Sequence, residues 1–252
     1  MRPVRTLVLL VLVLSFTPQA RAAGLFLRWN KCYGDGGAPN RTFACDINSG
    51  FELLAGGFAL GTDLAQVSGN EVVIDLASSG SALPAWWQLK NAGTCRQPAM
   101  NMNFVYDPAQ IVCVDWAQGS SAGGLGAYGI GARGPNTARI VAAIAVAPSQ
   151  LQDLSGGEEY FAFNILISHT KTVGSGACAG CTTPVCLVLA SINVTTPVLA
   201  NNRKLSGPGN GVDSDFVTWQ GGAGVVVGGA IGCPAATPTV RGTWGSVKSL
   251  YR

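Results

Sequence analysis

The feature that most constrains the fold is a succession of short apolar runs separated by clusters of Gly, Ser, Asn and Pro. Residues 159–168 alternate along the chain so that one strand face is wholly apolar, and residues 71–77 are rich in β-branched side chains. No amphipathic helical pattern longer than about two turns is found. We therefore expect an all-β protein, an antiparallel β-sandwich of the jelly-roll or immunoglobulin-like kind. The other runs expected to be strands are 24–30, 51–60, 139–147, 185–194, 215–220 and 225–227.

Adjacent tryptophans follow the strand expected at residues 71–77 and lie within residues 84–89. In an extended segment, Trp86 and Trp87 would point to opposite faces, so one of them could be exposed. An exposed tryptophan serves as a platform for sugars or as a hot spot for a protein partner. Tryptophan side chains are more often buried, here under a loop, than exposed. Trp86 and Trp87 are the candidate binding residues.

Glycine is concentrated in residues 119–134. Residues 129–134 formally match G-x-G-x-x-G, but a dinucleotide site needs a preceding strand, a following helix and an acidic residue about 20 positions later. We interpret the stretch as a flexible or turn-rich loop. It is also the one place where the mature chain, residues 23–252, could be subdivided; we otherwise expect a single domain.

The first 22 residues have the pattern of a secretory signal peptide. Arg2 and Arg5 precede the apolar run 7–16, and residues 20–22 supply the small-x-small motif that signal peptidase recognises. The run is shorter than the roughly 20 apolar residues that span a bilayer. We expect cleavage near Ala22 and export to the periplasm, the cell surface or the medium.

Charge excludes two classes of partner. Without Arg2, Arg5 and Arg21 the mature chain has 13 basic and 13 acidic side chains. Charged residues make up only 12% of the chain, against about 25% in ordinary globular proteins. A chain without a basic stripe has little to attract phosphates or anionic lipid, so we expect neither nucleic-acid binding nor a membrane span.

The chain has 8 cysteines, an even number that indicates disulfides in an exported protein. Short separations favour Cys32 with Cys45 and Cys95 with Cys113. In the C-terminal half we expect Cys186 to pair with Cys233, which leaves Cys178 with Cys181 in a small ring. Four cysteines allow three pairings, and the sequence does not choose among them.

The C-x-x-C motif at Cys178 and Cys181 could instead be redox-active. Thioredoxin-like enzymes place this motif at a helix N-terminus, which stabilises the thiolate. Here a Thr-Thr-Pro turn and a predicted strand follow. A thiol-disulfide oxidoreductase is therefore the third of our function classes, and a zinc site is less favoured because export oxidises the thiols.

A hydrolase is the second class. His169, the only histidine, would be the base of a catalytic triad, but no G-x-S-x-G motif is present and a structural hydrogen bond is the favoured interpretation. Glycoside hydrolysis needs two facing carboxylates, which Glu158, Glu159, Asp213 and Asp215 could supply. Glu158 and Glu159 are more simply the solvated start of a strand. We assign no catalytic residue.

Calcium is the one cofactor with candidate ligands. Asn210, Asp213 and Asp215 concentrate oxygen atoms in one predicted loop, and Asp35 with Asp46 form a weaker candidate pair. Calcium takes six to eight oxygen ligands, so both candidates need further ligands. No other cofactor is expected.

Several motifs resemble those of a group of exported bacterial proteins to which no activity is assigned. They are CAGCTTPVC from Cys178, FVTWQGG at residues 216–222 and the closing TWGSVKSLYR. An EVVIDL strand followed by Leu-Pro-x-Trp-Trp and a Cys-Arg pair completes the resemblance, which covers most of the mature chain. It implies a bacterial exported protein.

Together these features favour an exported, disulfide-stapled, non-catalytic surface or extracellular module. Such a module would be structural or would bind carbohydrate or another protein. The alternatives are a secreted hydrolase of extracellular polymers and the thiol-disulfide oxidoreductase.

Overall fold

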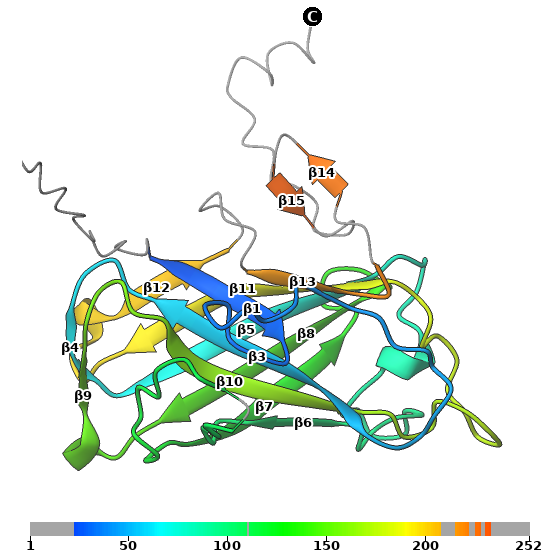
Figure 1. Ribbon diagram of the computed structural model, residues 1–252, viewed down its shortest axis with the longest axis horizontal. Helices are drawn as coiled ribbons and strands as arrows, with labels where there is room; N and C mark the ends of the chain where they lie inside the picture. The colour runs from blue at the N-terminus through cyan, green and yellow to red at the C-terminus, as the bar shows by residue number, and fades with distance from the viewer. Residues whose placement is uncertain (1–22, 110, 208–214, 222–224, 228–229, 233–252) are drawn as a thin grey trace, which may run out of the picture.

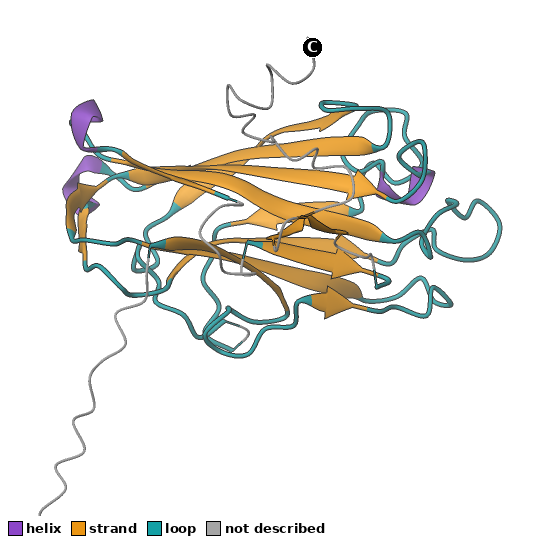
Figure 2. Cartoon of the chain, turned by 90° about the horizontal axis from the view of Figure 1, so that it is seen from above, coloured by secondary structure: helices purple, strands orange, loops and turns teal. Residues whose placement is uncertain are grey.

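The computed structural model describes residues 23–109, 111–207, 215–221, 225–227 and 230–232. These residues form an all-β structure of antiparallel sheets layered as a sandwich, which confirms the expected fold class (Figures 1 and 2). The smaller main sheet has four strands, all of them antiparallel to their neighbours. In spatial order they are β1 (Gly24–Trp29), β3 (Phe51–Ala59), β10 (Tyr160–Ser168) and β6 (Met100–Asn103).

As far as the chain is described, the larger sheet has seven strands, and its only parallel pair is β2 with β13. Six strands lie in the order β2 (Asn40–Arg41), β13 (Phe216–Trp219), β11 (Val185–Thr195), β5 (Gly69–Ser78), β8 (Thr137–Ala145) and β7 (Ala122–Ile130). The seventh, β12 (Arg203–Ser206), pairs with the second half of β11. Two smaller sheets pair β4 (Leu64–Val67) with β9 (Gln152–Leu154) and β14 (Val225–Val227) with β15 (Ala230–Gly232).

In the described part of the chain, helix is confined to three single-turn 3₁₀ segments. These are η1 (Ala85–Trp87), η2 (Pro148–Gln150) and η3 (Leu199–Asn201). Among the described residues, no helix is both long and apolar enough to cross a membrane.

The core fills the space between the two main sheets, and strand alternation explains it. On β5, Val72, Ile74 and Leu76 are buried at 1% exposure or less, whereas Glu71 before them is exposed and Val73 and Asp75 between them are half-buried. β8 repeats the pattern beside it, with every second side chain buried. Alternate residues of a strand point to opposite faces, so each sheet contributes one apolar face to a shared core.

β10 departs from simple alternation. A register shift between Phe161 and Phe163 against β3 marks a β-bulge. Phe163 joins the main core, whereas Phe161 packs in a separate cluster with Cys32, Ile111 and Cys113. The expected apolar face of this strand is thus divided between two clusters, because a bulge changes which side of the sheet the following residues face.

The prediction of a loop at residues 119–134 is wrong, because most of it forms β7. This strand pairs with β8 along nearly its whole length. At Gly123, packing explains why the residue is glycine. A Cβ there would lie 2.3 Å from the backbone oxygen of Ala143. Close approach of the β8 backbone therefore requires glycine in a strand whose composition predicts a loop.

Three disulfides are described, and none has the predicted pairing. They are Cys32–Cys113, Cys45–Cys181 and Cys95–Cys178, which join residues 81, 136 and 83 positions apart. The predictions relied on short separations, whereas the bridges join segments that only the assembled sheets bring together. Cys186 is also disulfide-bonded; its predicted partner, Cys233, lies outside the described residues.

Candidate functional site

A cleft of about 320 Å³ lies beside the start of β10. Three chain segments line it: the turn that follows β1, the segment between β6 and β7, and the segment that leads into β10. Its lining includes Asp35, Val112, Cys113, Val114, Glu158 and Glu159. It is the candidate site because it combines carboxylates, apolar side chains and a disulfide.

Backbone hydrogen bonds fix two walls of the cleft. The turn after β1 closes through the amides of Asp35 and Gly37, which both donate to the carbonyl of Cys32. Val114 pairs with the start of β10 by donating to the carbonyl of Glu159 and accepting from the amide of Phe161. The Cys32–Cys113 disulfide joins the two walls.

Glu159 stands at the centre of this arrangement and is only 6% exposed. Its Oε1 accepts the backbone N–H of Tyr33 at 2.9 Å, and its Oε2 accepts that of Gly34 at 2.7 Å. Hydrogen bonds from N–H groups to a carboxylate are stronger than neutral ones. The carboxylate therefore holds the turn after β1 against β10.

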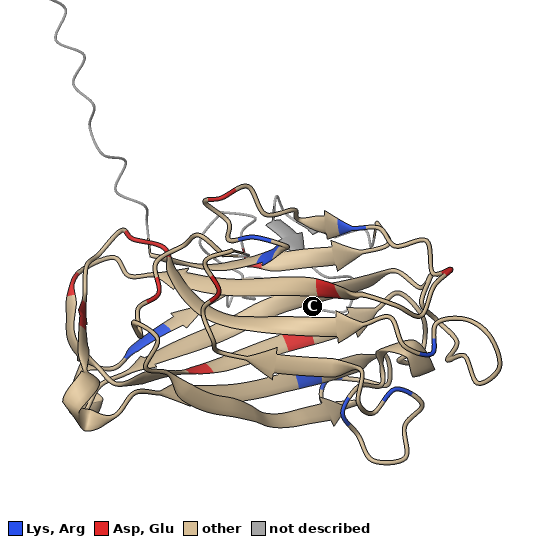
Figure 3. Ribbon diagram, turned by 60° about the horizontal axis from the view of Figure 1, so that its bottom comes forward, with Lys and Arg blue, Asp and Glu red and all other residues tan. Residues whose placement is uncertain are grey.

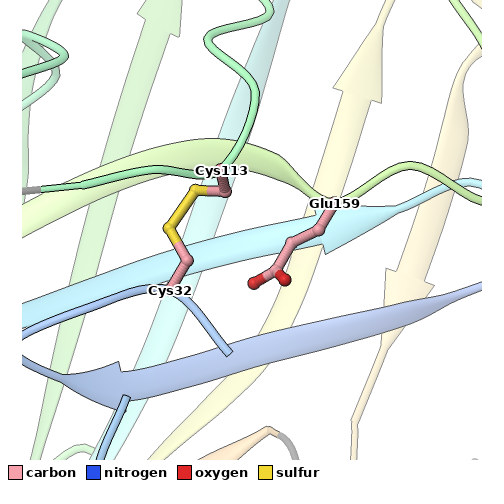
Figure 4. Close-up of side chains that lie close together, drawn as sticks. All are labelled: Cys32, Cys113 and Glu159. Carbon is pink, nitrogen blue, oxygen red and sulfur yellow. A yellow bond between two sulfur atoms is a disulfide. The ribbon is translucent and has the colours of Figure 1, made fainter. Parts of the chain in front are cut away.

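Glu159 also lies next to the disulfide, as Figure 4 shows. The Sγ atoms of Cys32 and Cys113 and a carboxylate oxygen of Glu159 all lie within 4.8 Å of one another, and all three residues are buried. Within the described part of the chain, this is the only group of three or more His, Cys, Asp and Glu side chains close enough to share a metal ion.

The charge of the cleft is negative. Asp35 and Glu158 add carboxylates to its lining, and the described lining includes no Lys or Arg. A tyrosine nearby is affected: burial, together with the negative charges of Asp115 and Asp35, raises the pKa of Tyr106. Figure 3 shows that Lys, Arg, Asp and Glu occupy few positions along the ribbon.

Two of the residues that line the cleft are solvent-exposed valines. Val112 is 64% exposed and Val114 is 46% exposed. Both residues line the cleft, on either side of Cys113. A ligand in the cleft would meet carboxylates and two solvent-facing aliphatic side chains together.

The role of Glu159 could not be recognised from the sequence. Glu158 and Glu159 were expected to form a solvated strand start, and this is wrong for Glu159, which is buried. Its partners are backbone amides more than 120 positions away. Of the other proposed carboxylates, Glu158 also lines the cleft, Asp215 is buried beside Gly207 and does not line it, and Asp213 lies outside the described residues.

Both candidate tryptophans are buried, which was the favoured of the two alternatives. Trp86 and Trp87 lie in the 3₁₀ helix η1 rather than in a strand, and both are 0% exposed. They pack against each other and against Trp219. Arg96 lies over the Trp86 ring at 3.6 Å from its centroid. The pair belongs to the core and offers no exposed platform for sugar.

His169 has a structural environment. Its Nδ1 faces the backbone oxygen of Ser49 at 2.7 Å, its Nε2 faces Glu52 at 3.1 Å, and its ring stacks on Phe43 at 3.9 Å. The histidine is 5% exposed. Because a backbone carbonyl occupies the position that a nucleophilic hydroxyl would need, the geometry is not that of a hydrolase triad.

Of the first set of calcium candidates, only Asp215 belongs to the described residues. Asn210 and Asp213 lie outside the described residues, and Asp215 is only 7% exposed. Asp35 lines the cleft, whereas Asp46 is exposed in another loop and does not line it. The described residues thus do not bring Asp35 and Asp46 together in the cleft.

The C-x-x-C motif does not form its own disulfide. Cys178 is bonded to Cys95, and Cys181 to Cys45. Both cysteines are buried, at 4% and 6% exposure. The motif therefore anchors two different loops, and the bond between neighbouring sulfurs that a redox motif uses is absent.

Comparisons of the chain with protein-family models, with curated proteins and with solved structures found no match in any of the three.

Proposed function

We propose that this chain is an exported, non-catalytic module that binds a cationic segment of another protein in the cleft lined by Asp35, Glu158 and Glu159. The observation that carries the proposal is the composition of this cleft, in which carboxylates lie next to two exposed valines. A Lys or Arg side chain flanked by aliphatic residues matches both features.

Export is supported by the sequence pattern and by the cysteines. Residues 1–22 have the organisation of a signal peptide with a cleavage motif ending at Ala22. Three disulfides join distant parts of the described chain, and such bonds persist in oxidising compartments. The resemblance to exported bacterial proteins agrees with this location.

A binding role is favoured over hydrolysis by the chemistry around each candidate residue. His169 already contacts acceptors through both ring nitrogens. Glu159 is held by two backbone amides, as a structural carboxylate would be. Between the two binding versions, burial of Trp86 and Trp87 removes the sugar platform, so we favour a protein partner over carbohydrate.

The proposal is tested with short synthetic peptides and the folded mature protein. One series carries a single Arg or Lys between aliphatic residues, and a matched series carries Gln at that position. We expect the cationic peptides alone to bind, with an affinity that falls as salt rises because salt screens the attraction between the peptide's charge and the carboxylates of the open cleft. Isothermal titration calorimetry gives the affinities.

The matched variants are D35N/E158Q, which neutralises two residues of the cleft, and E71Q, which neutralises an exposed carboxylate on β5 outside the cleft. We expect D35N/E158Q to weaken binding about tenfold, the effect of roughly 1.4 kcal/mol, and E71Q to bind like the parent. Failure of every cationic peptide to bind would contradict the proposal. An equal loss of affinity in E71Q would show that the peptide binds outside this cleft.

A further inference from the structure

The group formed by Cys32, Cys113 and Glu159 has a second chemical state besides the disulfide. We propose that reduction of the Cys32–Cys113 bond converts this group into a binding site for a soft divalent cation, with Zn²⁺ or Cd²⁺ as the class of ligand. The site would be redox-gated: closed when the sulfurs are bonded and open when they are thiolates. This inference does not depend on the proposed peptide partner. It applies only where a reductant overcomes the oxidising conditions that otherwise keep the bond closed.

Geometry is the first support. The three ligand atoms already lie within 4.8 Å of one another. The Cα atoms of the two cysteines are 5.9 Å apart. Two thiolates on a tetrahedral zinc ion, each at about 2.3 Å, stand about 3.8 Å from each other. Once the bond is reduced, the proposal requires the two sulfurs to separate to this distance by side-chain rotation.

Orientation of the carboxylate is the second support. Glu159 is fixed by the amides of Tyr33 and Gly34, which come from the same turn as Cys32. Outer hydrogen bonds of this kind hold a metal ligand in place and are typical of metal sites. Two sulfurs and one carboxylate oxygen form a mixed ligand set that suits zinc or cadmium better than calcium or magnesium.

Access and charge are the third support. Cys113 and Glu159 both line the cleft, so a cation can reach them from solvent. Asp35 and Glu158 line the same cleft and make its potential negative. A negative potential disfavours bare thiolates but favours a divalent cation bound to them. The fourth coordination position would face the cleft and hold water.

The chemistry balances with an external dithiol as the reductant. The dithiol gives two electrons and two protons to the Cys32–Cys113 bond, which becomes two thiols, while the dithiol becomes a cyclic disulfide. Zn²⁺ then displaces one proton from each thiol and binds both sulfurs and Glu159. Removal of the metal and reoxidation by any disulfide restore the original bond.

The test uses the folded mature protein, reduced in steps with a phosphine, because dithiols themselves bind zinc. At each step, free thiols are alkylated with and without Zn²⁺, and the modified cysteines are mapped by mass spectrometry. We expect Zn²⁺ to protect Cys32 and Cys113 and no other described cysteine. Circular dichroism follows the fold in the same samples. Cobalt(II) absorption bands, typical of thiolate coordination, report binding independently.

The matched variants are E159Q and E158Q. The first removes a proposed ligand and retains an oxygen that accepts an amide; the second changes a carboxylate of the same cleft that lies outside the three-residue group. We expect E159Q to weaken Co²⁺ binding about tenfold or more and E158Q to leave it within about twofold.

Three results would overturn the inference. Zinc could protect Cys178 and Cys181 instead, or protect nothing while the fold is retained. Alternatively, the chain could unfold before the Cys32–Cys113 disulfide is reduced. The folded protein would then never contain the two free thiols that the site needs. Loss of peptide binding has no bearing on these outcomes, since they are read from metal and thiols alone.

Discussion

The carboxylate of Glu159 accepts the backbone amide of Gly34 at 2.7 Å, although the two residues are 125 positions apart. The same carboxylate accepts the amide of Tyr33. It therefore joins the turn after β1 to the start of β10 and shapes one wall of the cleft. Disulfide Cys32–Cys113 fastens the same region covalently.

The first prediction concerns this contact. Glu159→Ala leaves two amides without their charged acceptor, and hydrogen bonds to charged groups each contribute about 1.5–3 kcal/mol. We expect the free energy of unfolding to fall by about 3 kcal/mol, measured by urea titration with the disulfides intact. Glu158→Ala, a change at the neighbouring residue, should cost less than about 0.5 kcal/mol. Equal losses of unfolding free energy in the two variants would show that the buried contacts of Glu159 do not stabilise the fold.

The second prediction concerns Arg96, which is 0% exposed. Burial lowers the pKa of Arg96 to about 10, so the guanidinium still carries its charge at neutral pH. It donates to the carbonyls of Trp86, Ser168 and Thr170 and lies over the Trp86 ring. We expect Arg96→Lys to destabilise the fold by about 2–4 kcal/mol. The ammonium group of lysine cannot reproduce the hydrogen bonds and ring stacking of the planar guanidinium.

A matched exchange tests whether the guanidinium geometry at Arg96 is responsible. Arg203 is exposed and donates only to backbone oxygens of Asn201 and Asn202. Arg203→Lys should therefore change stability by less than about 0.5 kcal/mol. Thermal unfolding of the two variants side by side gives the comparison, and a tolerant Arg96→Lys would contradict the structural role assigned here.

The third prediction is a pH effect at Tyr128. Burial raises the pKa of Tyr128, with only partial opposition from Arg96, and its hydroxyl donates to the carbonyl of Trp87. The folded state thus keeps a proton that the unfolded chain loses near pH 10. The stability that Tyr128 contributes is complete below about pH 10 and falls as pH rises beyond it.

Phenolate absorbance measures this directly. At about pH 11 we expect the folded parent and folded Tyr128→Phe to show the same phenolate signal, because Tyr128 remains protonated. In denaturant at the same pH, the parent should show one more ionised tyrosine than the variant. A difference between the two folded proteins would mean that Tyr128 ionises normally and is not buried as described.

The fourth prediction concerns β3. A Cβ on Gly56 would lie 2.1 Å from the ring of Phe163 on β10. We expect Gly56→Ala to destabilise the protein by about 1–3 kcal/mol, the usual cost of overpacking, and Gly56→Ala with Phe163→Leu to recover part of the loss. Gly124→Ala on β7 is the control, since a Cβ there meets nothing within 4 Å. Chemical denaturation of the three variants gives the ranking.

Much of the fold could be predicted because its signals are local. The alternation on β5 and the apolar run of β11 each specify a strand without reference to the rest of the chain. β7 was missed for the opposite reason: its glycines have little strand propensity, and only contact with β8 makes it a strand. Tertiary context overrode composition there.

The site was less predictable than the fold because its contacts are distant in sequence. Cys32 could be recognised as a disulfide cysteine, but the fold alone selects Cys113 over the nearer Cys45. Trp86 and Trp87 were placed in a strand, since nothing in their local sequence shows that Arg96 and Trp219 enclose them. Glu159 had no local signal of burial, because its acceptor role depends on amides of the turn after β1.

The central claim is that the acidic cleft beside Cys113 binds a cationic, aliphatic-flanked segment. The most direct measurement is the affinity of one Arg-containing peptide for the parent, for D35N/E158Q and for E71Q, at low and high salt. We predict salt-sensitive binding to the parent and to E71Q, with about tenfold loss in D35N/E158Q. Binding that is unchanged in D35N/E158Q, or absent from the folded parent at every salt concentration, would contradict the claim.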